Sequence, residues 1–284
     1  MKHTIILNAT LNFFHAVKKY VIKRNEELGF KFVSLDSVVS DKFNYSVGNS
    51  KLGQKKVLNY GLSIQHTCAG DAPCKQKGKC YGTGGCFQFG SNLQRVAENT
   101  AFVLVNRKHI ENIVAVFQAM INENPKIKYF RHFEIGDIPY IEYINAMVQI
   151  AVENPDVTFW CYTKKYALVN AWIDQNGLDA MPSNLTIIFS HWRNDDGSYY
   201  PMDNRYDFPT SEYIPLGQEH LTETVTHVCP CSDPNVLSNC VNCDKPCFEL
   251  KHGESMALLE HSTVRTRERD RRVKAAHKAL KKSA

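Results

Sequence analysis

The sequence predicts an α/β protein built on parallel strands, either a partial (β/α) barrel or an open parallel sheet. Short apolar runs suited to strands recur with starts 29 and 28 residues apart, at 128–135, 157–162 and 185–190. Segments with helical periodicity lie between them, at 139–153 and 165–175. Alternation of strand and helix is typical of parallel βα units. A complete eight-fold barrel typically needs about 250 residues of this pattern, and the chain has too few.

Further elements flank these three units. Residues 10–30 have mixed helical spacing and predict a first helix, and residues 45–63 predict a loop or hairpin. Helical periodicity returns at 89–100 and 107–123. A fourth or fifth βα unit is expected over 211–228.

Composition and charge narrow the class of protein. The 284 residues are 43% hydrophobic and 22% charged, which excludes a wholly disordered or fibrous chain. No stretch approaches the roughly 20 apolar residues of a membrane span, and we identify no signal peptide. We therefore expect a cytoplasmic protein without a membrane partner. The formal net charge is +5, but residues 264–284 alone carry +7 and the rest of the chain carries −2.

The chain divides into four predicted parts. Residues 1–60 form the N-terminal helix and lead-in segment, and 61–228 the βα core with a first cysteine loop. Residues 229–250 form a C-terminal cysteine cluster, and 251–284 a basic helical tail, with the helix itself over 255–282. A tail of this charge attracts phosphate backbones, so nucleic acid is one expected partner, and a solvated terminal helix is the alternative.

Ten cysteines are the strongest signal in the sequence. Nine of them fall within two short windows, 68–86 and 229–247. Without a secretion signal, metal binding is favoured over a disulfide framework. Cys161 lies within a strand pattern and reads as a core residue.

The first window has the spacing C-x5-C-x5-C-x5-C and contains five glycines. Structural zinc sites usually use C-x2-4-C turns, whereas long, glycine-rich gaps suit a loop around an iron–sulfur cluster. We expect Cys68, Cys74 and Cys80 as ligands, with Cys86 either a fourth ligand or a bystander. A four-cysteine zinc site and plain buried thiols are the alternatives.

The second window has the spacing C-x1-C-x8-C-x2-C-x3-C. We expect a set of four ligands, with Cys231 able to replace one of them: Cys229, Cys240, Cys243 and Cys247. Spacing does not separate zinc from an auxiliary iron–sulfur cluster at this site.

Polar residues follow the three predicted core strands. Because chemistry in parallel α/β folds lies at the carboxyl ends of strands, these residues are candidates for binding a cofactor or substrate in one crevice: Glu134, Asp137, Lys164, His191 and Arg193. Polar loop residues without a function are the alternative.

Several ordered motifs resemble the phage "gene product 88"-like family. They are GNSKLGQ at 48–54, LSIQHTCAGDAPC at 62–74, RHFEIGD at 131–137, FWCYTKK at 159–165 and the late C-x2-C. A weaker resemblance is to radical S-adenosylmethionine enzymes, which have a partial βα barrel and an early three-cysteine loop. Their usual spacing is C-x3-C-x2-C, from which this chain departs.

The radical-enzyme resemblance implies a 4Fe–4S cluster with one open iron, and S-adenosylmethionine bound to it. We therefore expect an iron–sulfur protein, an enzyme of radical type, that acts on an unknown substrate in the phage's host cell, with nucleic acid as one candidate. The alternative expectation is a zinc-stabilised nucleic-acid-binding protein without catalysis.

Overall fold

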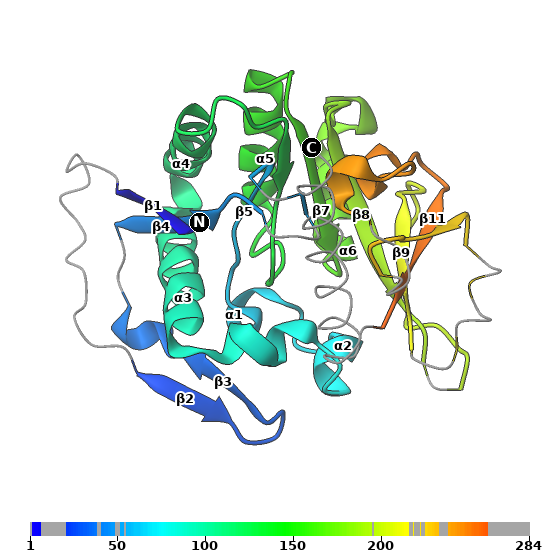
Figure 1. The fold of residues 1–284 in the computed structure, drawn as a ribbon, viewed down its shortest axis with the longest axis horizontal. Helices are drawn as coiled ribbons and strands as arrows, with labels where there is room; N and C mark the ends of the chain where they lie inside the picture. The colour runs from blue at the N-terminus through cyan, green and yellow to red at the C-terminus, as the bar shows by residue number, and fades with distance from the viewer. Residues whose placement is uncertain are drawn as a thin grey trace, which may run out of the picture.

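A large, mostly parallel sheet organises the protein in the computed structural model (Figure 1). The structure describes residues 2–6, 21–38, 41–48, 52–53, 55–194, 196–215, 218, 222, 225–232 and 238–260. The sheet has nine strands in the order β1-β4-β5-β6-β7-β8-β9-β11-β10. β1, β4 and β5 pair antiparallel, and every pair from β5 to β10 is parallel.

The strands of the sheet are β1 Lys2–Ile6, β4 Lys42–Ser46, β5 Val57–Asn59, β6 Tyr129–Arg131, β7 Thr158–Thr163, β8 Leu185–Trp192, β9 Thr210–Ile214, β10 His227–Val228 and β11 Ser255–Leu259. A separate hairpin consists of β2 Ile22–Asn25 and β3 Phe30–Val33. The helices are α1 Ile64–Thr67, α2 Pro73–Gln76, α3 Gly90–Val105, α4 Ile110–Asn122, α5 Glu142–Glu153 and α6 Tyr166–Asn176.

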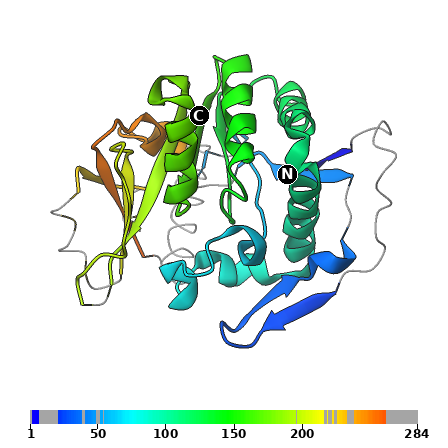
Figure 2. The ribbon, with the colours of Figure 1, turned by 180° about the vertical axis from the view of Figure 1, so that it is seen from behind.

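Helices cover one face of the sheet, as the view from behind shows (Figure 2). Strand β7 illustrates why, because successive side chains of a strand point to opposite faces. Phe159 and Cys161 enter the large core beneath α4, α5 and α6, whereas Trp160 enters a second core on the other face. Cys161 is fully buried, which confirms its prediction as a core residue.

On the second face of the sheet, the C-terminal cysteine segment, 238–250, packs against β5 to β8 through two short 3-10 turns (Figure 1). Phe248 packs with ring centroids 5.0 Å from both Tyr129 and Trp160. The backbone carbonyl of Phe248 accepts a 2.7 Å hydrogen bond from Thr186 Oγ1 on β8. Burying an aromatic side chain of this size contributes about 1.5–3 kcal/mol, so Phe248 is a main anchor of the segment.

The predicted core elements are confirmed, with shifted ends. The three strands and the helices between them form β6, α5, β7, α6 and β8, and the two helices before them form α3 and α4. The nine strands of the main sheet form one row with β1 and β10 at its edges, so the open-sheet alternative is supported and the barrel is not. The segment expected to carry a further βα unit supplies β9 and β10.

Two predictions of helix are wrong where the structure describes the chain. Residues 21–30 belong to the β2–β3 hairpin, because the turn at Gly29 reverses the chain and Phe30 enters a buried cluster. Residues 255–259, the expected start of the basic helix, form β11 between β9 and β10, where sheet pairing outweighs helical spacing. The basic tail, 264–284, and residues 10–20 lie outside the described residues.

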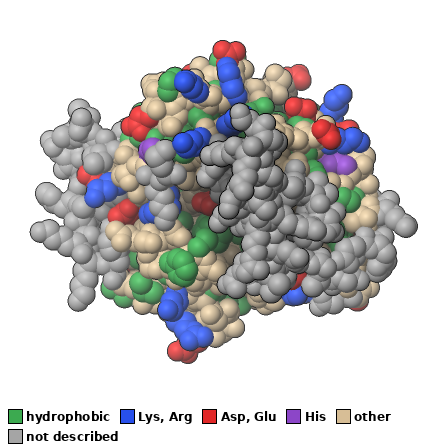
Figure 3. All heavy atoms as spheres, in the orientation of Figure 1, with side chains coloured by type: hydrophobic (Ala, Val, Ile, Leu, Met, Phe, Trp, Pro, Cys, Tyr) green, Lys and Arg blue, Asp and Glu red, His purple; other side chains and the backbone are tan. Residues whose placement is uncertain are grey.

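Charges on the visible described surface are of both signs and interspersed (Figure 3). This agrees with the small net charge of the chain outside its tail. None of the helices in the described parts of the chain combines the length and apolar character that a membrane span requires.

Candidate functional site

Asp137 ties the carboxyl ends of two core strands to the first cysteine loop. Its carboxylate accepts hydrogen bonds from Thr163 Oγ1 at 2.6 Å and from the backbone N–H of Lys164 at 2.9 Å, both at the end of β7. Its own backbone N–H donates to Thr67 Oγ1 at 3.0 Å, one residue before Cys68. The side chain is buried, and burial raises the pKa of Asp137 despite these hydrogen bonds.

Gly136 allows the loop to approach the strand end this closely. Its φ is +88°, and an added Cβ would lie 2.6 Å from the backbone oxygen of Leu62. Leu62 in turn donates its N–H to Ile135 O at 2.8 Å. Only glycine suits this combination of positive φ and backbone contact, so the EIGD motif positions both Asp137 and the start of the cysteine loop.

The first three cysteines of the loop gather beside this strand end. The thiol of Cys80 donates to Cys74, and this hydrogen bond lowers the pKa of Cys74 and raises that of Cys80. Cys68 lies within electrostatic range of Cys74, Asp137 and Lys164, although burial is the main cause of its raised pKa. Cys86 differs from these three in being exposed.

Lys164 extends over the next strand end. Its ammonium donates to Ser190 Oγ at 2.7 Å and lies 5.9 Å from the ring centroid of Trp192, both on β8. The hydroxyl of Tyr166 donates to the backbone carbonyl of Ser190. Asp137, Lys164 and Ser190 thus bring three neighbouring strands, β6 to β8, together beside the thiols.

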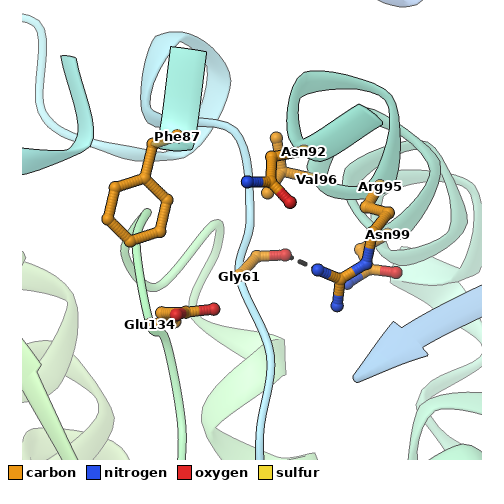
Figure 4. A pocket seen from close by; sticks show the side chains of 7 residues that line it. All are labelled: Gly61, Phe87, Asn92, Arg95, Val96, Asn99 and Glu134. Carbon is orange, nitrogen blue, oxygen red and sulfur yellow. Dashed lines mark hydrogen bonds between the residues drawn. The ribbon is translucent and has the colours of Figure 1, made fainter. Parts of the chain in front are cut away.

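Glu134, predicted for the same crevice, lies elsewhere. It lines a small pocket against α3 with Gly61, Phe87, Asn92, Arg95, Val96 and Asn99 (Figure 4). Asn99 closes one side of this pocket by donating to Gly61 O at 3.0 Å. The two carboxylates of the EIGD motif therefore have different neighbours.

His191 and Arg193 form a third group, around Glu212 of β9. Arg193 Nε donates to Glu212 Oε1 at 2.6 Å, and the two side chains are 10% and 6% exposed. Tyr199 stacks on His191 with ring centroids 4.2 Å apart and also donates to Glu212. Burial lowers the pKa of His191. Arg193 is thus paired within the protein.

Cys229, Cys240 and Cys247 of the second window lie on the second face of the sheet, opposite α4, α5 and α6. Tyr162 of β7 donates to Cys247 Sγ at 2.8 Å. Burial raises the pKa of Cys247 to about 12, and Cys229 and Cys243 lie within electrostatic range of it. The thiol of Cys229 donates to Cys231, a contact that raises the pKa of Cys229.

The C-x2-C turn of this window is locally well defined. Asn239 caps the 3-10 helix Cys240–Asn242 by accepting from the backbone N–H groups of Val241 and Asn242. Gly53, with φ of +80°, packs so closely that an added Cβ would lie 3.0 Å from the Cβ of Val241. The GNSKLGQ motif and the late C-x2-C, distant in sequence, are therefore in contact.

The thiols are grouped but not arranged as a ready-made site. Among the described residues, no set of three or more His, Cys, Asp or Glu side chains converges in a way that could hold a metal ion. The donor chemistry nevertheless fits thiolate-bound metals, because three thiols interact in the first loop, and those of Cys229, Cys231, Cys243 and Cys247 interact in the second window. Metal binding would require these sulfurs to converge further.

The fold and its thiol groups define a cysteine-rich α/β protein with an open, mostly parallel sheet. A family model described as "Gene product 88" matches residues 40–276, and the chain belongs to this family. Searches of curated proteins and of solved structures gave no significant match. The resemblance to the "gene product 88"-like family is therefore confirmed, whereas these comparisons give no support to the resemblance to radical S-adenosylmethionine enzymes.

Proposed function

We propose that this chain is an iron–sulfur protein whose first cysteine loop holds a cluster at the carboxyl edge of the sheet, and that it is an enzyme resembling radical S-adenosylmethionine enzymes. The gathering of Cys68, Cys74 and Cys80 beside Asp137 and Lys164 is the observation that carries the proposal. Loop thiols and strand-end polar groups from distant parts of the chain meet at the edge where α/β proteins bind ligands.

The donor set suits a cluster of this kind. Three thiolates can ligate three irons of a 4Fe–4S cluster and leave the fourth for a small molecule, here S-adenosylmethionine. The bound cluster would supply one-electron chemistry, which protein side chains alone do not. The spacing C-x5-C-x5-C differs from that of the radical enzymes, so the cluster is the primary claim and S-adenosylmethionine the secondary one.

The neighbouring residues have distinct roles in this proposal. Lys164, whose ammonium is held by Ser190, would bind a carboxylate or phosphate of the ligand. Asp137 positions the backbone of Lys164 and the start of the loop through its hydrogen bonds. Glu134, His191 and Arg193 lie in separate groups, so we assign them no contact with this ligand.

Metal analysis of protein purified without air tests the proposal. We expect iron and sulfide, and absorbance near ~400 nm that dithionite bleaches. Replacing Cys68, Cys74 or Cys80 by alanine should remove this centre. Cys161→Ala is the matched control, because Cys161 is a fully buried core thiol outside the first cysteine loop. Full iron content in any of the three loop variants would remove that cysteine from the ligand set.

A zinc-stabilised protein that binds nucleic acid is the second candidate function. The capped C-x2-C turn at Cys240 favours it, because such turns are typical of structural zinc sites. This candidate predicts a colourless protein with zinc but no iron. Its affinity for DNA or RNA should fall steeply with salt and should depend on residues 264–284.

A further inference from the structure

An exposed apolar patch joins the β2–β3 hairpin to the segment that follows the first cysteine loop. This hairpin patch consists of Phe89, Ile22 and Val21, which are 64%, 50% and 43% exposed. The two segments are in contact, because a Cβ added at Gly90 would lie 3.8 Å from Ile22 Cδ1. In Figure 3, hydrophobic side chains gather at the lower left of the described surface, where Figure 1 places this hairpin. Single exposed apolar residues are ordinary, whereas a contiguous group marks an interaction site.

Contacts with the rest of the protein hold the hairpin in place. The backbone N–H of Lys31, on β3, donates to Gln88 Oε1 at 2.7 Å. Phe30 is buried, and Phe87 packs against the same apolar cluster. The hairpin patch is therefore presented by a fixed element, which reduces the entropy that is lost when a partner binds.

Charged side chains of the hairpin lie in two groups of like sign. Arg24 points to the same face of the hairpin as Ile22 and lies directly opposite Lys31. Glu26 and Glu27 follow in the turn between the strands. All four charged side chains are exposed, and none makes an ion pair or a side-chain hydrogen bond within the described parts of the chain. Like charges on directly opposite strand residues repel, so each group would be stabilised by the opposite charge from outside.

A second copy of this chain supplies both signs of charge at once. In a two-fold symmetric dimer both partners present the same surface, so the acidic turn of one copy can lie beside the basic strands of the other. A nucleic acid would satisfy the two cations but would be repelled by the turn. Lys23 does not change this balance, because its ammonium lies 3.7 Å from the carboxylate of Asp36.

We propose that the hairpin patch is the interface of a homodimer with two-fold symmetry. In this dimer Phe89 and Ile22 become buried, and the acidic turn of each copy pairs with Arg24 and Lys31 of the partner subunit. Apolar anchors at the centre of an interface supply most of its affinity, and the flanking charges fix the orientation of the two copies. The interface does not involve the thiols of either window, so the inference is independent of the proposed iron–sulfur centre.

Sedimentation equilibrium of the full chain at several concentrations is the direct test. We expect a reversible dimer of twice the chain mass of 32.4 kDa. Phe89→Ser should raise the Kd of the dimer about 30-fold or more, the loss typical of a central aromatic anchor.

Val152→Ser is the matched control. Val152, on α5, is 62% exposed, much like Phe89, but it lies outside the hairpin patch. This substitution should leave the Kd of the dimer unchanged. A chain that is monomeric at every concentration, or equal weakening of the dimer by the two substitutions, would overturn the proposal.

Exchanging the charges tests the orientation of the two copies. Glu26→Lys combined with Glu27→Lys leaves both groups basic, and Arg24→Glu combined with Lys31→Glu leaves both acidic. Each variant alone should dimerise at least about 10-fold more weakly than the unmodified chain, because like charges then meet. An equimolar mixture of the two should regain the original affinity through mixed dimers. A mixture that associates no better than either variant alone would contradict this arrangement. Because these side chains are exposed, circular dichroism should show that both variants remain folded.

Labelled single-stranded DNA and RNA test the other occupant of the hairpin patch. We expect these strands to leave the dimer intact. Dissociation of the dimer by the strands, or a monomeric chain whose affinity for them falls in Phe89→Ser, would assign the hairpin patch to nucleic acid and overturn the proposal.

Discussion

Replacing Gly136 by alanine tests whether backbone contact at the end of β6 positions the first cysteine loop. The glycine has φ of +88° and lies against the backbone of Leu62. An alanine Cβ would lie 2.6 Å from Leu62 O and 2.8 Å from Leu62 Cβ. Because neither neighbour is the end of a flexible side chain, the two backbones must separate.

The size of the effect follows from two terms. Separation by about 0.8 Å restores ordinary van der Waals contact, and strain of this kind costs about 1–3 kcal/mol. The positive φ adds about 1–2 kcal/mol for a residue with a Cβ. We therefore expect Gly136→Ala to lower the free energy of unfolding by about 2–5 kcal/mol.

Urea denaturation followed by circular dichroism measures this change, with Gly29→Ala as the control. Gly29 also has positive φ, +68°, but no atom lies within 4 Å of its added Cβ. The control variant should therefore lose only about 1–2 kcal/mol of its free energy of unfolding, because of its positive φ. In protein purified without air, Gly136→Ala should also hold less metal in the first loop, because the loop and Asp137 move apart.

Equal destabilisation by the two glycine variants would refute the reasoning, because it would show that the contact with Leu62 has no cost. Unchanged metal content in a clearly destabilised Gly136→Ala would refute the link between this contact and the cysteine loop.

Three further predictions concern other parts of the molecule. Burial lowers the pKa of His132 in the folded protein to about 3, so on acidification the unfolded chain binds a proton at a higher pH than the folded protein does, and stability should fall below about pH 6.5. Between about pH 7.5 and pH 5, this residue alone should lower the free energy of unfolding by about 2 kcal/mol, measured by urea denaturation, and His132→Phe should abolish that pH-dependent loss. Glu212→Gln should lower the free energy of unfolding by about 3–5 kcal/mol, because it leaves the Arg193 cation buried without its carboxylate partner. Asp174→Asn, in a half-exposed ion pair, should lower it by less than about 1 kcal/mol, and similar losses in the two variants would contradict the role of burial. Gly53→Ala should lower the free energy of unfolding, because its Cβ would displace Val241 beside Cys240, and an unchanged value by the same measurement would show that this contact does not hold the C-x2-C turn.

Local patterns predicted the core well because each depends on a few neighbouring residues. The apolar runs of β6, β7 and β8 and the helical faces of α3 to α6 follow from periodicity alone. The segment at 21–30 misled the prediction, because its mixed spacing suits a helix while Phe30 is buried through contacts with residues far along the chain. The same holds for β11, whose pairing partners lie about 30 to 45 residues earlier in the sequence.

Some of the site residues could likewise be predicted from the sequence, and others could not. Cysteine spacing indicated both thiol groups, and strand-end polarity indicated Asp137 and Lys164. Neither showed that Tyr162 faces the second window, since it has the pattern of an ordinary strand residue.

Sequence by itself determined the parallel α/β class, the two cysteine windows and the family, because periodicity, ligand chemistry and ordered motifs are all properties of the linear chain. Only the tertiary structure decided that Glu134 turns to α3 while Asp137 turns to the thiols, and that the late cysteines cover the face where helices would otherwise pack. The physical reason is that these placements depend on which distant segments of backbone can approach one another closely, as they do at Gly53 and Gly136. Such close approach is determined by the packing of the whole sheet.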